Sequence, residues 1–364
     1  MSLRVIQWAT GGTGRNALRH ILAHPELELV GVWAHNPDKY GIDAAELCGW
    51  PSETGVRATG NVDELIGLRA DCISYMRTNP YYPLGDQSAS SEVDAVVDEL
   101  ARLLRSGSNV VSLTTLPLVW PPMWGQPVLD RLEAACEAGR SSLRAVGICP
   151  GFYTDALPLM LSGMCERIDR IRYIQLLNYS RYAQPTRMRM LGFGVAPSEL
   201  KPRDPHRMAA VYAPAMYLMA AALGVELSGF AEDFQWRVTP DDLDVASGRI
   251  EAGTVGAIRM ELQGLVEREP LFVFEVVSRL RNDLAPEWPN MGGREGFRVV
   301  IEGQPNLTAD CDIGAEAGNG IEITLNQTAA LAVNEIPGTC RSRPGVHSFL
   351  DAPVTTGRFG LRSR

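Results

Sequence analysis

Glycines gather near the amino terminus in a spacing that suits phosphate chemistry. The run Gly11-Gly12-Thr13-Gly14-Arg15-Asn16-Ala17 follows a short apolar stretch at residues 3–8 and opens a segment with helical spacing. The first turn of a helix has unpaired N–H groups and a partial positive charge, so such a turn can hold a diphosphate. Residues 10–15, from Thr10 to Arg15, are therefore predicted to bind a dinucleotide; the alternative is a glycine turn that binds nothing.

The small residues of this turn are assigned separate roles. Gly11 is expected to make the tight turn out of the strand, and Gly14 to let the backbone approach the diphosphate. Ala17 is small enough for the helix and the strand to pack closely.

The tip of the next predicted strand, residues 27–34, informs the choice of cofactor. NAD-binding sites usually place an acid here to bind the ribose 2′-hydroxyl. This tip instead reads His35-Asn36-Pro37-Asp38-Lys39. We therefore predict NADP, with NAD possible, and cofactor contacts from His35, Asn36 and Lys39. An inward-turned Asp38, or a solvated loop, is the alternative.

The first 150 residues alternate two kinds of segment. Short apolar runs lie at 3–8, 27–34, 71–76, 109–113 and 143–148, and helical spacing occurs at 13–23, 92–105 and 126–138. Apolar strands alternating with helices indicate a parallel sheet covered on both faces. We expect a doubly wound α/β domain of the Rossmann type over residues 1–150.

The pattern then changes to alternating strands. Residues 257–266 carry Ile258 and Met260 on one face and Arg259 and Glu261 on the other, and further strand signals lie at 271–277, 297–302 and 307–313. This favours an α+β domain with an open, largely antiparallel sheet over 151–325, with one solvated or partner-facing side. Residues 326–364, with helical spacing at 326–333, are expected to pack back on the first domain.

Composition excludes several classes of protein. The 364 residues include 34 basic and 43 acidic ones, for a net charge of −9, which argues against nucleic-acid binding. The seven cysteines are odd in number and scattered, with no Cys-x-x-Cys motif, so we predict neither a metal site nor a disulfide framework, and a cytoplasmic protein. Residues 208–225 are uncharged but rich in Ala and contain Pro214; we expect a buried helix rather than a membrane span.

Several motifs resemble one enzyme family. The glycine turn with Arg15 resembles the amino-terminal domain of dihydrodipicolinate reductases, and Thr114-Thr115 resembles their paired threonines beside the nicotinamide. Still more similar is the branch of 2,4-diaminopentanoate dehydrogenase and the native amine dehydrogenases. The segments that resemble it are Gly147-Ile148-Cys149-Pro150-Gly151-Phe152, Gly192-Phe193-Gly194 and Asn334-Glu335-Ile336-Pro337.

The resemblance implies a two-domain NAD(P)-dependent oxidoreductase, usually a homodimer, that moves a hydride to or from a C=N or related carbon of a small molecule. It implies that Thr114, Thr115 and Pro150 lie at the cofactor and Phe152 at the substrate.

The chain also departs from the family pattern. It lacks the His-His-x-x-Lys segment of true dihydrodipicolinate reductases, which argues against lysine biosynthesis. Residues 113–120 contain no acid where the amine dehydrogenases carry a glutamate, and Cys149 replaces an asparagine. Three functions therefore stay open: amine or imine chemistry, alcohol or carbonyl chemistry, and a non-catalytic NAD(P)-binding redox sensor.

Hydride transfer also needs a partner for the proton. Tyr179 and Tyr182, with Thr115, are the catalytic candidates, and Asn178 is expected to orient a polar group of the substrate. Trp120, in a proline-rich segment with Trp124, is predicted to form an apolar wall that suits a mainly apolar substrate. Ordinary packing is the alternative for each of these aromatic residues, and a solvated basic patch is the alternative to an anion contact at Arg187 and Arg189.

Overall fold

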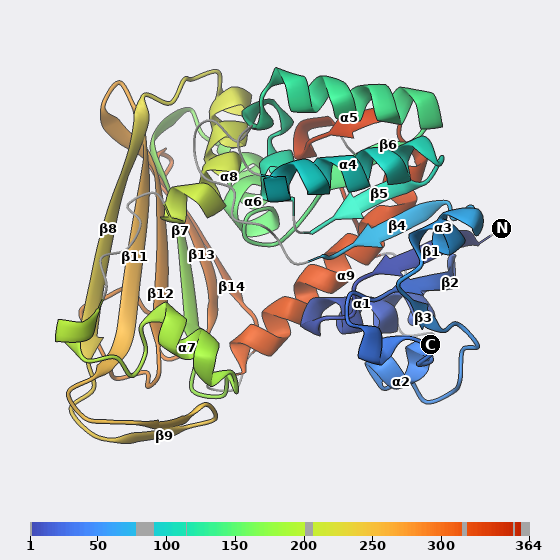
Figure 1. Ribbon diagram of the computed structural model, residues 1–364. Coiled ribbons are helices and arrows are strands. Elements are labelled where there is room, and N and C mark those ends of the chain that lie inside the picture. The colour runs from blue at the N-terminus through green and yellow to red at the C-terminus, as the bar shows by residue number, and fades with distance from the viewer. Residues whose placement is uncertain are drawn as a thin grey trace, which may run out of the picture. The chain divides into compact units, whose positions relative to one another are not determined.

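The computed structural model describes residues 2–77, 91–113, 115–200, 207–314, 319–351 and 354–357. The chain divides into two compact units (Figure 1). The first unit comprises Met1–Gly151 together with Leu325–Arg364, and the second comprises Phe152–Thr324.

A parallel sheet forms the centre of the first unit. Its strands are β1 (Leu3–Trp8), β2 (Leu27–Trp33), β3 (Ala58–Thr59), β4 (Cys72–Tyr75), β5 (Asn109–Ser112), β6 (Ser142–Ala145) and β15 (Gly345–His347). They lie in the order β15-β6-β5-β4-β1-β2-β3, and every neighbouring pair is parallel. The chain order reverses beside β1, which is where open α/β sheets bind ligands, at the carboxyl ends of the strands. The predicted doubly wound fold is confirmed.

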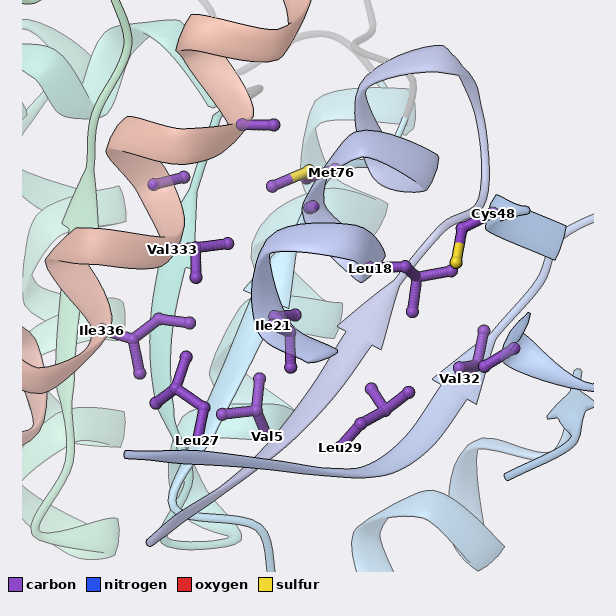
Figure 2. Close-up of a cluster of buried hydrophobic side chains, with 14 of the residues drawn as sticks. Val5, Leu18, Ile21, Leu27, Leu29, Val32, Cys48, Met76, Val333 and Ile336 are labelled. Atoms are coloured by element: carbon purple, nitrogen blue, oxygen red, sulfur yellow. The ribbon is translucent and has the colours of Figure 1, made fainter. Parts of the chain in front are cut away.

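Helices pack on both faces of this sheet. They are α1 (Gly12–Ala23), α2 (Ala44–Cys48), α3 (Val62–Gly67), α4 (Ser91–Arg105), α5 (Gln126–Gly139) and most of α9 (Gly320–Arg341). Figure 2 shows Ile21 of α1 and Ile336 of α9 meeting Val5 in one buried cluster. On the opposite face, the Leu65 side chain of α3 packs directly on the backbone of Gly31 in β2, where a Cβ would lie 2.8 Å from it. Burial on both faces explains why these strands are continuously apolar.

Helix α9 is longer than the sequence pattern predicted. Helical spacing was expected at 326–333, but the helix begins at Gly320 and continues through Pro337 to Arg341. Pro337 lies inside the helix, although proline usually marks a helix end. Ala329, Val333 and Ile336 are buried against the first unit's sheet.

A mixed sheet forms the second unit. Its strands are β7 (Arg167–Asn178), β8 (Gly229–Val238), β11 (Val255–Val266), β12 (Glu269–Arg279), β13 (Gly296–Gln304) and β14 (Leu307–Asp312), in the order β14-β13-β7-β12-β11-β8. Only β7 and β12 pair in parallel among these described strands. A separate hairpin joins β9 (Leu243–Val245) and β10 (Gly248–Ile250). The open, largely antiparallel sheet expected from the sequence is confirmed.

The two faces of this second sheet differ. One packs against α8 (Arg207–Leu223), where Tyr212 meets Phe274 edge to face, and against α6 (Leu157–Ser162). The other face carries charge: the fully buried carboxylate of Glu275 contacts Arg172 and lies 3.2 Å from the Arg259 Nε. Helix α8 covers residues expected to form a buried helix, and no helix of the described chain is long and apolar enough to cross a membrane.

Candidate functional site

In the corner between β1 and α1, the small residues have other conformations than the sequence predicts. Ala9, directly after β1, has a φ of 82°, the left-handed conformation that glycine normally supplies at the tight turn. Gly11, expected to make this turn, has an ordinary φ of −72°. Gly11 lies at the bend before α1, whereas Ala9 supplies the left-handed residue of this corner.

Gly14 also has another role than the one predicted. A Cβ added to Gly14 would lie 2.2 Å from the carbonyl oxygen of Ala9, so only glycine lets helix α1 pack this close to the strand. A Cβ added to Gly11 would meet nothing within 4 Å, and one added to Gly12 only Leu325 at 3.9 Å. Gly11 and Gly12, not Gly14, thus leave the open approach that a diphosphate needs.

An open pocket of about 350 Å³ lies at this corner. Five predicted cofactor residues line it: Thr10, Gly11, Gly12, Arg15 and Lys39. The other lining residues, Ile42, Glu46 and Leu47, were not predicted. Helix α1 has no side-chain cap and no acidic residue in its first turn. The amino-terminal end of α1 therefore carries a partial positive charge, and the cationic side chains of Arg15 and Lys39 lie beside it. No side chain blocks the approach to Gly11 and Gly12. Both features suit the binding of a dinucleotide phosphate.

Lys39 stabilises the turn by hydrogen bonds and also adds a positive charge to the pocket. Its Nζ donates to the carbonyl oxygen of Thr10 at 2.9 Å and to the Thr10 hydroxyl at 3.0 Å. His35 and Asn36 are exposed and do not line the pocket, and the Asn36 Oδ1 accepts a hydrogen bond from the backbone N–H of Asp38 at 3.1 Å. The structure therefore brings Lys39, but neither His35 nor Asn36, to the glycine turn.

Helix α2 contributes the pocket residues that the sequence did not reveal. Asp43 caps this helix, and its carboxylate accepts hydrogen bonds from the backbone N–H groups of Ala45, Thr54 and Gly55. Burial opposes its ionisation, but these donors still hold the pKa of Asp43 below its usual value. This rigid cap places Glu46 at the pocket. The helix is too short to show a periodic signal, so no sequence pattern identified it.

The residues predicted at the nicotinamide lie elsewhere in the first unit. Thr115 is buried, and its hydroxyl contacts that of Ser112 at the end of β5. Because the fold itself engages this hydroxyl, the predicted catalytic role of Thr115 is not supported. Thr114 lies outside the described residues. Pro150 belongs to a tight turn after β6 in which Ile148 and Gly151 form a bridge.

In the second unit, Asn178 is the last residue of β7, and Tyr179 and Tyr182 follow it. Asn178 is buried; its Nδ2 donates to Asn282 at 2.9 Å and its Oδ1 accepts from the Ser180 N–H at 2.9 Å. Its amide thus supports the local turn, and the predicted substrate contact is not supported. Tyr179 and Tyr182 lie edge to face with ring centroids 5.9 Å apart. Burial raises the pKa of Tyr179 to about 12, so this phenol keeps its proton throughout the neutral range and is a weak proton donor.

The remaining predicted contacts are spread over several segments. Trp120 is half-buried between two short 3₁₀ helices, Leu116–Val119 and Pro121–Trp124. Phe152, at the start of the second unit, is 39% exposed. Arg189 forms an exposed ion pair with Glu199 at 3.7 Å, as the solvated alternative expected.

Glu335, in a segment that resembles the amine dehydrogenases, has a structural partner. Its carboxylate contacts Arg144 of β6 and the hydroxyl of Thr355, with both charged side chains buried. Burial raises the pKa of Glu335 to about 7, against the opposing effect of Arg144. This pair joins α9 to the first unit's sheet.

Comparison with known proteins supports the interpretation of this fold. Residues 152–362 match the model of the 2,4-diaminopentanoate dehydrogenase C-terminal domain. The chain is 36% identical to an amine dehydrogenase of Streptomyces virginiae over 99% of each chain. It is 24% identical to the 2,4-diaminopentanoate dehydrogenase of Acetoanaerobium sticklandii over 72% of this chain and 71% of that one. The amine dehydrogenase structure from Mycobacterium smegmatis shares its fold, with a TM-score of 0.74, 19% identity and 99% of both chains covered.

The doubly wound fold, its phosphate-type turn and these relatives define an NAD(P)-dependent oxidoreductase. The chain belongs to the 2,4-diaminopentanoate dehydrogenase and amine dehydrogenase family, as the sequence resemblance predicted.

Proposed function

We propose that this enzyme transfers a hydride between NADP and the C=N carbon of a small, mainly apolar substrate, in the manner of an amine dehydrogenase or imine reductase. The pocket at the start of α1, in a chain whose full-length relative is named an amine dehydrogenase, carries the proposal. The bound nicotinamide would supply or accept the hydride. The chain would hold the diphosphate on the N–H groups of the first helical turn, with Gly11 and Gly12 leaving space for it.

The preference for NADP rests on charge. Arg15 and Lys39 both line the pocket, and cationic side chains favour the extra 2′-phosphate. Glu46 lines the same pocket and opposes this preference, so NAD is expected to bind with lower affinity rather than to be excluded. Steady-state kinetics with NADPH and NADH at fixed substrate would test the order; a strong preference for NADH would contradict it.

The substrate would meet apolar side chains. Trp120 is half-buried among prolines and Phe152 is exposed, so both rings are accessible for a carbon skeleton. Tyr182 is the remaining candidate for a polar contact, since the fold engages the amide of Asn178 and the hydroxyl of Thr115. Turnover confined to highly charged substrates would contradict an apolar site.

One experiment separates the possible functions. Trp8, at the end of β1 before the turn, stacks on Trp33 of β2 with ring centroids 5.1 Å apart, so tryptophan fluorescence should report cofactor binding. The titration with NADPH is followed by a panel of aliphatic ketones with and without ammonia, monitored by cofactor absorbance. Ammonia-dependent oxidation of NADPH supports the proposal. Turnover without ammonia would identify a carbonyl reductase, and binding without any turnover a redox sensor.

Assembly and location complete the proposal. We expect a homodimer, as the resemblance to the dihydrodipicolinate reductase-like family implies; size-exclusion chromatography with light scattering tests this. A cytoplasmic location is consistent with seven cysteines that are all free.

A further inference from the structure

A buried amide contacts the turn that precedes the pocket. Gln7 lies in β1 with no exposed surface, and its Nε2 donates to the carbonyl oxygen of Ala9 at 3.0 Å. This carbonyl faces α1 at the point where a Cβ on Gly14 would collide with it. Gln7 therefore bonds to the group that sets the spacing between the strand and the helix.

Ala9 needs such support. Its φ of 82° lies in the left-handed region, where a Cβ is strained and glycine is the usual residue. The Ala9 N–H donates to the carbonyl of Trp33 at 2.9 Å, so the position is constrained on both sides of its Cα. An alanine can persist in this conformation only if its surroundings stabilise it.

The Oε1 atom of Gln7 indicates which part of the amide is useful to the fold. Its Oε1 has no hydrogen-bond partner in the part of the chain that the structure describes. A buried acceptor without a partner lowers stability, whereas methionine would fill similar space without that cost. The benefit of an amide at this position must therefore come from its donor, which binds Ala9.

We infer that Gln7 is a positioning residue, whose hydrogen bond to Ala9 replaces the conformational freedom of glycine and fixes the turn that receives the cofactor diphosphate. The next carbonyl, that of Thr10, is held by Lys39 in the same way. Two successive peptide groups are thus oriented by side chains before α1 begins. The inference rests on the proposed function, in which residues 10–15 bind NAD(P)H.

A mutant cycle tests it. Gln7→Met removes the donor and should raise the Kd for NADPH about five- to tenfold, the effect of losing one net hydrogen bond. Ala9→Gly alone should change the Kd less than about twofold, because glycine adopts the turn unaided. The Gln7→Met/Ala9→Gly double variant should return to within about twofold of the wild type. The KM for NADPH should follow the Kd while kcat at saturation stays nearly constant.

Ile6→Val is the matched control, because Ile6 is a buried neighbour that packs on the opposite face of β1, against Gly31. It should leave the Kd unchanged. The inference is overturned if Gln7→Met binds NADPH like the wild type, or if the double variant binds as weakly as Gln7→Met or does not fold. A Gln7→Met protein that folds only in the Ala9→Gly background supports it. Failure of the wild type to bind either NADPH or NADH overturns the proposed function itself, an outcome seen before any variant is made.

Discussion

The corner after β1 and the turn after β7 differ in how they use polar groups. At the β1 corner the proposed ligand-binding groups are backbone N–H groups at a helix start, and the polar side chains Gln7 and Lys39 contact the backbone. At the β7 turn the chemistry was expected from side chains, yet the Asn178 amide is engaged within the fold and Tyr179 packs among aromatic rings. A backbone site can be recognised from spacing alone, whereas a side chain's role depends on partners that are distant in sequence.

The largest expected effect comes from Gly14. Gly14→Ala should lower the free energy of unfolding by about 3 kcal/mol and abolish NADPH binding, because the new Cβ overlaps the Ala9 carbonyl. Gly11→Ala, with open space around its Cβ, should keep the stability within about 0.5 kcal/mol but weaken NADPH about tenfold. Urea unfolding and fluorescence titration measure both. Equal stability losses would show that the two glycines do not have separate roles.

At the β7 turn, Asn178→Ala should lower the free energy of unfolding by about 2 kcal/mol, because it removes two hydrogen bonds from a buried amide. NADPH affinity should not change. The comparison is Asn282→Ala at an exposed position, which removes one of these bonds together with the bond from the Asn282 amide to the carbonyl of Gly293, and it should cost about 1 kcal/mol. If Asn178→Ala instead raised the substrate KM at unchanged stability, the contrast between the two regions would fail.

Lys39→Met should weaken NADPH about tenfold and NADH about threefold, because it removes both the charge and the contacts with Thr10. Asp38→Asn, at the exposed neighbouring position, serves as the control for local charge. If the affinities for NADPH and NADH fell by the same factor, Lys39 would act only by stabilising the turn.

The smallest effect is expected at Tyr179. Tyr179→Phe should change kcat less than about twofold between pH 7 and 9, because burial keeps this phenol protonated with a pKa of about 12. A raised pKa in the folded state stabilises the protein fully below the unfolded value of about 10 and loses that contribution as the pH rises through 12. The variant and the wild type should therefore differ in pH-dependent stability only above about pH 10, as thermal unfolding can show.

Much of the fold follows from local patterns. Apolar runs such as 3–8 and 27–34 became parallel strands, and the alternation over 257–266 became β11. Local patterns predict only part of α9, which continues through Pro337, and they do not predict short elements such as β3 and β15.

The candidate site was predicted unevenly for a related reason. Thr10, Gly11, Gly12, Arg15 and Lys39 meet at one pocket, because motif and geometry coincide at a strand–helix corner. The left-handed Ala9 was missed, since alanine gives no sign of a positive φ in a sequence. Glu46 was missed because a tertiary cap on a short helix brings it in.

Helix α9 has a consequence for the design of truncated proteins. A fragment that ends at Gly151 contains the whole pocket at the start of α1 but lacks Val333 and Ile336, which lie in one buried cluster with Val5 and Ile21 in the intact unit (Figure 2). Such a fragment would expose a continuous apolar surface and is expected to aggregate. A nucleotide-binding module that can be expressed alone would need residues 325–357 rejoined to it, for instance by circular permutation through a flexible linker.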